Sequence, residues 1–347
     1  MKIIVDAMGG DNAPDSMVQG ALDAIQAYKT QVVLVGQEEL LRQTLAKCGA
    51  SQLPEQLEIV HAGQVITMED NPATAFKEKK DSSMTVGLTL LREGQGDAFV
   101  SAGSTGALLS AATMLAKRIR GIRRAALAPV LPGVGSILID CGATAEGRPE
   151  FLLQYAYMGA FYASYVLNRP QPRVALLNIG AEPGKGTSLQ VETYALLQRA
   201  AEQGRLNFVG NLEPSELISD PADVLVADGY AGNIMLKAME GTAKMVLGQL
   251  KGVFTANLLT RINYLMLRGR LKGMRKNLDA NEVGGTPLLG LARPVIKAHG
   301  SSNAYAVQNA IRQAIQFASS GFIESVTENV QYMRLDLTDE GRDKSPA

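Results

Sequence analysis

The sequence predicts an α/β fold in which helices cover both faces of a mostly parallel β-sheet. Two patterns indicate this class. Short apolar segments rich in β-branched residues alternate with longer segments of helical spacing, and loops rich in small residues follow the apolar segments. Repetition of strand, loop and helix produces βαβ units, and nearly continuous apolar runs are typical of parallel strands buried on both faces.

Seven apolar runs are expected to form strands; the first reads Lys-Ile-Ile-Val and the second Val-Val-Leu-Val. In chain order the expected strands span residues 2–5, 32–35, 57–60, 97–101, 136–140, 173–178 and 223–227. The segments between and after them have apolar residues at helical spacing. The expected helices span residues 16–28, 38–48, 85–93, 106–119, 150–167, 188–203 and 304–318.

Length and composition set the domain organisation. A chain of 347 residues with 46% apolar residues can bury a sizeable core. Two domains would fit this length, but no composition shift marks a boundary, so we expect residues 1–333 to form a single α/β unit. Residues 334–347 are polar and charged and are expected to form a flexible tail.

Composition also excludes several classes of protein. The only cysteines, Cys48 and Cys141, form no C-x-x-C pair, which excludes a disulfide framework and a zinc ribbon and fits a reducing cytosol. No run of about 18 apolar residues could span a membrane, and no secretory signal precedes the first strand. The absence of Trp and the low aromatic content argue against a nucleic-acid partner.

Residues 241–278 form a basic amphipathic segment. They include eight Lys and Arg and no Asp or Glu, whereas the whole chain has 34 basic and 34 acidic residues. This pattern predicts a helical tip that meets anionic lipid. Packing in a dimer interface and docking of an acidic protein are alternatives for the same segment. The expected membrane-contacting residues are Leu258, Leu259, Ile262, Leu265, Met266, Arg268 and Lys272.

Six loops rich in small residues are candidates for ligand binding: residues 6–11, 101–106, 140–144, 178–186, 228–233 and 297–303. Ligands of open α/β sheets bind beyond the carboxyl ends of the strands. Glycine lets backbone N–H groups approach an anion, and a following helix adds partial positive charge. Any one loop is most simply a tight turn, but six favour a site for phosphate or an oxyanion. The expected substrate-binding residues are Asp6, Gly9, Gly10, Asp11, Ser104, Thr105, Gly106, Asp228, Gly229, Gly300 and Ser301.

Three residues are candidates for catalysis. Lys185 lies between two glycines just past an apolar strand, where it could bind phosphate or stabilise an oxyanion. Asn233 and His299 could donate hydrogen bonds to a substrate. The structural alternatives are a solvated loop Lys185, Asp228 in an Asx-turn and a structural His299.

The sequence lacks the common cofactor-binding motifs. No G-x-G-x-x-G occurs, and the glycines from residue 180 to residue 186 lack the spacing and the Ser or Thr of a Walker A loop. No metal-spaced cluster of His and Asp stands out. We therefore expect neither a metal nor a cofactor.

Several motifs together resemble one family. They are VDAMGGDNAP (5–14), KKDSSM (79–84), SAGSTG (101–106), Lys185-Gly186, Asp228-Gly229 with Gly232-Asn233, GGTPLLG (284–290) and KAHGSS (297–302). From residue 1 to about residue 320 the chain resembles the PlsX-type phosphate acyltransferases of bacterial phospholipid synthesis. It departs from the usual family pattern at Thr144, Glu146 and Lys77, where members usually carry Asn, Asp and Arg.

The resemblance implies an enzyme that moves a long acyl group from acyl carrier protein to inorganic phosphate. It implies a three-layer α/β/α fold like that of isocitrate and isopropylmalate dehydrogenases, and a homodimer. It also implies a cytoplasmic protein held peripherally on the inner face of the cell membrane through the 241–278 tip. A membrane glycerol-3-phosphate acyltransferase would then consume the acyl-phosphate.

Three alternative functions stay open at this point. A phosphotransacylase would take acyl-CoA in place of the carrier protein. A decarboxylating dehydrogenase would need clustered carboxylates for a divalent metal, which the sequence does not offer. A non-catalytic membrane scaffold would use the amphipathic tip but would not need Lys185 or the glycine loops.

Overall fold

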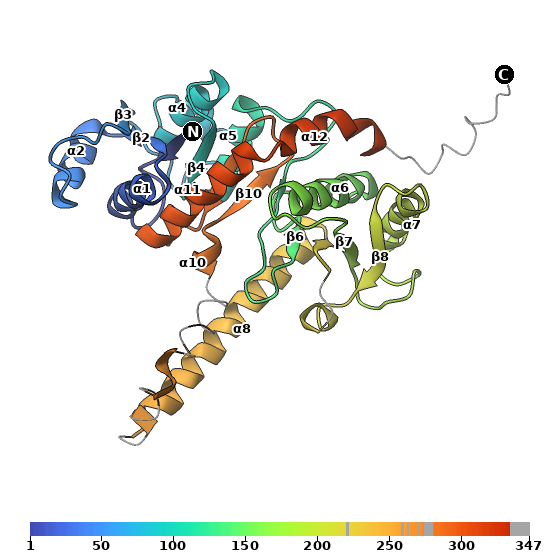
Figure 1. The fold of residues 1–347 in the computed structure, drawn as a ribbon. Coiled ribbons are helices and arrows are strands. Elements are labelled where there is room, and N and C mark those ends of the chain that lie inside the picture. Colours follow the sequence, from blue (N-terminus) through green and yellow to red (C-terminus); the bar gives the residue numbers. More distant parts are fainter. Residues whose placement is uncertain are drawn as a thin grey trace.

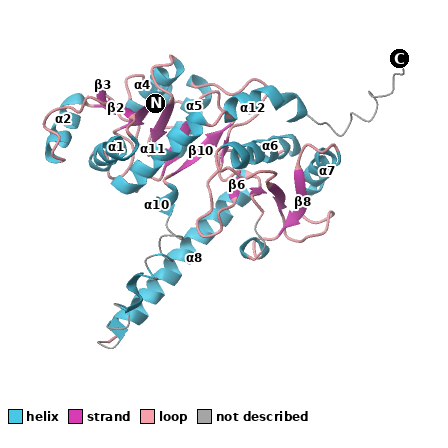
Figure 2. Ribbon diagram, viewed as in Figure 1, coloured by secondary structure: helices cyan, strands magenta, loops and turns pink. Residues whose placement is uncertain are grey.

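The computed structural model shows an α/β fold with two largely parallel sheets and flanking helices, which confirms the predicted fold class (Figures 1 and 2). It describes residues 1–219, 222–257, 260–261, 264, 266–269, 271, 273 and 280–333. The expected flexible tail, 334–347, lies outside the described residues.

The larger sheet has seven strands in the order β3-β2-β1-β4-β11-β10-β5. Neighbouring strands are parallel, except that β10 runs antiparallel to both β11 and β5. The strands are β1 (Lys2–Asp6), β2 (Gln31–Gly36), β3 (Leu57–His61), β4 (Ala98–Ser101), β5 (Ala126–Leu127), β10 (Gly285–Leu289) and β11 (Val295–Ala298).

The smaller sheet has four parallel strands in the order β6-β9-β7-β8. They are β6 (Ile137–Ile139), β7 (Arg173–Leu177), β8 (Asn207–Leu212) and β9 (Val224–Val226). Both sheets contribute to one hydrophobic cluster, in which Ile3 and Val100 of the larger sheet share a core with Ile139 and Val174 of the smaller. The division of 1–333 into one unit or two remains a prediction.

Successive residues of each strand face opposite helix layers, as strand geometry requires. In β1, Ile3 and Val5 belong to the cluster formed with α1 (Asp15–Tyr28) and α11 (Ala304–Ser319). Ile4 belongs to a second cluster, formed with α4 (Ser83–Arg92) and α5 (Thr105–Leu115). The other described helices are α2 (Glu38–Lys47), α3 (Ala75–Glu78), α6 (Pro149–Tyr165), α7 (Ser188–Glu202), α8 (Gly229–Thr255), α10 (Ala280–Val283) and α12 (Phe322–Asn329).

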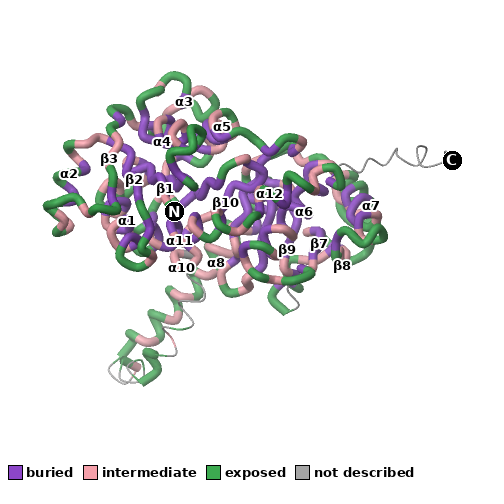
Figure 3. The backbone as a smooth tube through the Cα atoms, turned by 45° about the horizontal axis from the view of Figure 1, so that its top comes forward, coloured by how far each residue is buried: buried purple, intermediate pink, exposed green. Residues whose placement is uncertain are grey.

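Helix α8 projects away from the two sheets (Figures 1 and 3). Its buried residues lie in the first two turns, whereas the later turns are largely exposed. The helix begins twelve residues before the predicted 241–278 tip, because Asp228 caps it. No helix in the described residues is long and apolar enough to cross a membrane.

The structure describes only two of the seven residues expected to contact the membrane. Leu258, Leu259, Ile262, Leu265 and Lys272 lie outside the described residues. Met266 has 81% of its surface exposed, and Arg268 is also exposed.

Glycine at position 159 lets α6 lie directly on β9. A Cβ there would sit 2.4 Å from Val224 Cγ1, so Gly159→Ala should push the helix off the sheet. We expect a loss of ~1–3 kcal/mol in the free energy of unfolding, measured by urea denaturation. Gly241→Ala in exposed α8, where a Cβ meets nothing within 4 Å, is the matched control and should stabilise by up to ~1 kcal/mol. Equal effects of the two substitutions would contradict this packing.

Candidate active site

Three predicted loops meet beyond the carboxyl ends of β1, β4 and β11, which are adjacent in the larger sheet. The Asp11 backbone N–H donates to the Gly300 carbonyl at 2.8 Å. The Ser101 hydroxyl donates to Asp6 Oδ2 at 2.7 Å, and the Asn12 amide donates to the Ser301 carbonyl at 3.2 Å. The loops 6–11, 101–106 and 297–303 therefore form one connected group, here called the first loop group.

Two glycines permit this close approach. A Cβ on Gly9 would lie 2.6 Å from Asp6 Oδ2 and 2.8 Å from the Gly103 nitrogen. Gly10 has φ +103°, and a Cβ there would lie 2.9 Å from the Ala102 Cβ. Only glycine combines this backbone conformation with this spacing.

Asp6 stabilises the first loop group from a buried position. Its side chain is buried, and its two oxygens accept hydrogen bonds from Ser101 and from the Met8 backbone. Burial raises the pKa of the Asp6 carboxyl above its usual range. These contacts favour a role in shaping the first loop group over the direct substrate contact predicted from the sequence.

Lys297 begins the predicted 297–303 loop but was not among the site residues predicted from the sequence. Its side chain is buried, and its ammonium donates to the Ala298 carbonyl and lies 3.5 Å from the Ala102 carbonyl. Burial lowers the pKa of Lys297 to about 8, although the charges of Asp6 and Asp11 oppose the change. The sequence does mark this residue, because Lys297 is the only charged residue in the otherwise apolar strand β11.

His299 is held as a hydrogen-bond donor. Its Nδ1 accepts the Ser301 backbone N–H at 3.2 Å and lies 2.9 Å from the Ser301 hydroxyl. Burial and the nearby positive charge of Lys237 lower the pKa of the ring. The lowered pKa favours the neutral ring. In the tautomer in which Nδ1 accepts the Ser301 N–H, the proton is on Nε2, which could then polarise a carbonyl.

Serine and threonine at the start of α5 lie at the edge of the first loop group. Ser104 is buried at the N-cap position, whereas Thr105 is exposed. A Cβ on Gly106 would lie 2.9 Å from Pro72, so this glycine faces the 64–74 segment. Substrate binding by these three residues remains a prediction.

A second loop group lies beyond the adjacent strands β6, β9 and β7 of the smaller sheet. Its centre is the buried carboxylate of Asp140, which accepts the backbone N–H groups of Leu127, Ala143 and Thr144 at 2.8–3.1 Å. The start of α8 presses against this loop: a Cβ on Gly232 would lie 2.0 Å from the Asp140 carbonyl oxygen. Gly229 makes a similar approach, since a Cβ there would lie 2.5 Å from Asp140 Oδ2.

The side chains at the start of α8 have separate roles. Asp228 caps the helix, since its Oδ1 accepts the N–H groups of Tyr230 and Ala231 at 3.0 and 2.9 Å. This is the Asx-turn that the sequence left as an alternative to ligand binding. Asn233 is exposed beside Gly142, and its amide makes no hydrogen bond with another described residue. Its donor groups are therefore available to a ligand.

Lys185 also has a free cationic group. It lies in the exposed loop after β7, where the Asn178 amide holds its backbone carbonyl at 3.0 Å. No carboxylate in the described part of the chain lies within 4 Å of its ammonium. Lys185 and Asn233 follow the adjacent strands β7 and β9 of the smaller sheet, whereas His299 follows β11 of the larger sheet. Among the described residues no hydrogen bond or ion pair joins Lys185 to Asn233 or His299, so the structure does not bring the three candidates together.

Helix α8 links the two loop groups electrostatically. Lys237 and Glu240 form an ion pair at 2.9 Å. The charge of Lys237 lowers the pKa values of both His299 and Cys141, and the charge of Glu240 raises them. Burial raises the pKa of the Cys141 thiol far above its ordinary value. The thiol is therefore a poor nucleophile.

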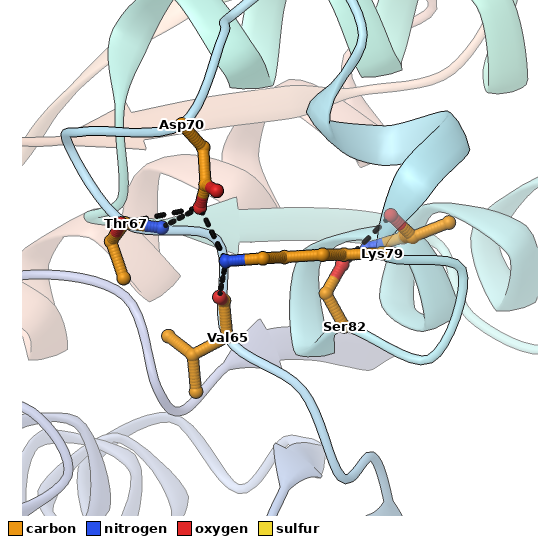
Figure 4. Close-up of polar contacts among 6 residues, drawn as sticks. Val65, Thr67, Asp70, Lys79 and Ser82 are labelled. Carbon is orange, nitrogen blue, oxygen red and sulfur yellow. Dashed lines mark hydrogen bonds and ion pairs between the residues drawn. The ribbon is translucent and has the colours of Figure 1, made fainter.

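The KKDSSM motif fixes the 64–74 segment beside α5 (Figure 4). The Lys79 ammonium donates to Asp70 Oδ2 at 2.6 Å and to the Val65 carbonyl at 2.9 Å. The Thr67 backbone N–H donates to the same Asp70 oxygen at 2.7 Å. Unlike Lys185, Lys79 is thus committed to a structural contact. Across the described residues, no three His, Cys, Asp or Glu side chains form a group able to hold a metal ion.

Comparison with known proteins decides the family. Residues 1–325 match the family model described as fatty acid synthesis protein. A relative from Alkaliphilus oremlandii, named phosphate acyltransferase, is 44% identical over 333 residues, covering 95% of this chain and 97% of its own. The chain belongs to the phosphate acyltransferase family.

Solved structures of low sequence identity share the fold of this phosphate acyltransferase family member. A phosphotransacetylase from Streptococcus pyogenes has a TM-score of 0.60 at 19% identity, covering 92% of this chain and 94% of its own. A 4-hydroxythreonine-4-phosphate dehydrogenase from Klebsiella pneumoniae has a TM-score of 0.53 at 14% identity, covering 92% and 98%. Both support the α/β fold class.

The carboxyl of Asp140 should make stability depend on pH. Burial raises its pKa to about 6 from an ordinary 3.8, because desolvation outweighs the N–H donors. The folded state therefore binds this proton more tightly than the unfolded chain, and stability is lost as pH rises from about 4 to about 6. The full change is ~3 kcal/mol.

Asp140→Asn removes this titration while changing stability by a constant amount. We expect the difference in unfolding free energy between the original and the variant to change across pH 4–6 and to be level above pH 7, measured by urea denaturation at each pH. A difference that is constant from pH 4 to pH 7 would show that Asp140 titrates normally in the folded state.

Proposed function

We propose that this protein transfers a long-chain acyl group from acyl carrier protein to inorganic phosphate, giving acyl-phosphate for phosphatidic acid synthesis. Its family membership supports acyl transfer to phosphate. The observation that carries the proposal is the pair of loop groups, which present an unpaired Lys185, an unpaired Asn233 amide and the Nε2–H of His299 at strand ends. Neutral and cationic donors of this kind suit a phosphate and a developing oxyanion.

The reaction that we propose is direct attack. A phosphate oxygen forms a bond to the thioester carbonyl carbon, and the carbonyl electrons move to oxygen. When the tetrahedral oxyanion collapses, the C–S bond breaks and the thiolate leaves, taking a proton from solvent. Phosphate is partly dianionic at neutral pH, so no general base is needed.

Each candidate residue has a role in that sequence. Lys185 and the glycine-loop amides hold the phosphate, which would otherwise be costly to desolvate. Asn233 or His299 donates to the carbonyl oxygen as negative charge develops there. The raised pKa of buried Cys141 favours this route over a covalent acyl-enzyme.

The test is to incubate the purified protein with palmitoyl–acyl carrier protein and phosphate, and to trap acyl-phosphate as the hydroxamate. Phosphate-dependent product supports the proposal. A parallel reaction with palmitoyl-CoA separates it from the acyl-CoA phosphotransacylase alternative. Product from neither donor, with binding to anionic vesicles intact, would favour the non-catalytic scaffold.

Lys185→Ala should lower turnover about a hundredfold or more, because one fixed donor to a developing charge contributes ~3–4 kcal/mol. The variant should keep its fold, since the side chain is exposed. Lys47→Ala, at the exposed end of α2, is the matched control and should keep normal turnover. Near-normal turnover of Lys185→Ala would remove Lys185 from the site.

We also propose that the projecting α8 region contacts the anionic inner face of the cell membrane, where a glycerol-3-phosphate acyltransferase would take the product. Exposed apolar residues of this region include Met245, Val253 and Met266. Each nearby Lys or Arg would add about 1 kcal/mol of attraction to anionic lipid. A homodimer and a cytoplasmic location belong to the same proposal.

Met266→Glu should weaken co-sedimentation with anionic vesicles while activity on soluble palmitoyl–acyl carrier protein stays normal. Met68 has 75% of its surface exposed on the larger-sheet body, so Met68→Glu is the matched control and should bind vesicles normally. Equal losses of vesicle binding in the two variants would contradict a specific contact by the projecting region.

A further inference from the structure

A second acid-free basic segment lies between α5 and β6. Residues 98–139 contain no Asp or Glu, and all their charges are positive: Lys117, Arg118, Arg120, Arg123 and Arg124. These five side chains are exposed. The proposed roles of the two loop groups and of α8 account for none of them.

Four arginines line a cavity of about 660 Å³. Arg118, Arg123 and Arg124 come from the loop after α5, and Arg148 comes from the start of α6. The guanidinium groups of Arg124 and Arg148 each lie 5.8 Å from the centre of the Phe151 ring, which attracts both cations. We call these four arginines and Phe151 the arginine bowl.

Hydrogen bonds hold the backbone of the bowl in place. The Arg123 backbone N–H donates to Gln154 Oε1 at 2.8 Å, and Gln154 Nε2 donates to the Gly121 carbonyl at 3.1 Å. Gln154 is buried in α6, and the Arg118 guanidinium donates to the Arg123 carbonyl. The arginines therefore project from a fixed loop, which reduces the entropy lost when a ligand binds.

The bowl has no neutralising acid. None of its four arginines forms an ion pair within 4 Å in the part of the chain that the structure describes. Glu146 and Glu150, which flank Arg148 in sequence, form no ion pair with them either. Four like charges around one cavity favour an anion, and planar guanidinium groups suit phosphate oxygens in particular.

A second cavity, of about 310 Å³, leads from the bowl toward the candidate active site. Arg118 and Arg124 line both cavities, and Ala143 and Thr144 also line the second. Its walls include the apolar side chains of Phe76, Leu109 and Met114, together with the polar side chains of Lys77, Ser110 and Thr113. Thr144 belongs to the Asp140 loop, whose Gly142 lies against Asn233.

We propose that the arginine bowl binds the phosphate of the phosphopantetheine arm on the acyl thioester donor, and that the adjoining cavity directs the arm toward Asn233. This inference rests on the proposed acyl transfer. The arm combines an anionic phosphate at one end with a largely uncharged chain and a thioester at the other, which matches the order of arginines, apolar walls and candidate site. Carrier protein and CoA both have such an arm.

The test removes the guanidinium groups of Arg124 and Arg148, which make no hydrogen bond with another described residue. Arg124→Gln/Arg148→Gln should raise the KM for palmitoyl–acyl carrier protein about tenfold or more, because charge-assisted hydrogen bonds are lost. Turnover at saturating donor and the KM for phosphate should stay within about twofold. Arg42→Gln/Arg92→Gln removes the same charge from exposed sites on α2 and α4, and should leave all three constants unchanged.

Binding measurements identify the source of the phosphate and keep the inference separate from the proposed function. Calorimetry with holo-carrier protein, apo-carrier protein and CoA should show that the double variant loses affinity for ligands with the arm. Loss with CoA as well as holo-carrier protein supports recognition of the arm itself, even if the original protein makes no acyl-phosphate. An unchanged donor KM and unchanged affinities, equal losses with apo-carrier protein, or a rise confined to the KM for phosphate would each overturn the inference.

Discussion

The close contact between the start of α8 and the Asp140 loop is the constraint on which much of the candidate site depends. A Cβ at Gly232 would meet the Asp140 carbonyl oxygen at 2.0 Å, so glycine alone allows the helix to begin there. The helix start then fixes Asn233 beside Gly142 and sends the remainder of α8 away from the sheets. The same loop carries Thr144, which lines the cavity that adjoins the arginine bowl.

The charged side chains around the candidate site are of two kinds: buried or paired ones that hold the backbone, and exposed ones without a carboxylate partner in the described residues. Asp6 and Asp140 are buried with hydrogen bonds to loop groups, so they hold backbone in place. Lys79 is likewise committed, to Asp70. Lys185 and the four arginines of the bowl lack carboxylate partners in the described residues and are free to bind anions. In the proposed reaction this separates the acceptor phosphate, near Lys185, from the donor phosphate, near the bowl.

Much of the fold could be predicted because periodicity and strand-end geometry are local properties. All seven expected strands are present, and the six small-residue loops follow strands of the two sheets. Four strands were missed, and they lack a clear pattern. Strand β10 contains Gly285 and Pro287, β8 contains Gly210, β5 has only two residues, and Lys297 interrupts the four-residue strand β11. The division into two sheets was not predictable, because strand order depends on contacts between distant segments.

The site was predicted less completely than the fold. Sequence could propose Lys185, Asn233 and His299 from residue chemistry, but it could not show that Asp228 caps a helix or that Lys297 and Asp6 share a buried setting. The arginine bowl was missed because Arg148 joins the other three arginines only in the folded chain.

The most direct test of the account is whether donor and phosphate occupy the site together. Initial rates of acyl-phosphate formation would be measured while palmitoyl–acyl carrier protein and phosphate are varied against each other. Direct attack requires both substrates at once and predicts intersecting lines in the double-reciprocal plot. Parallel lines would indicate a covalent acyl-enzyme, and would contradict the assignment of the two loop groups to a single displacement.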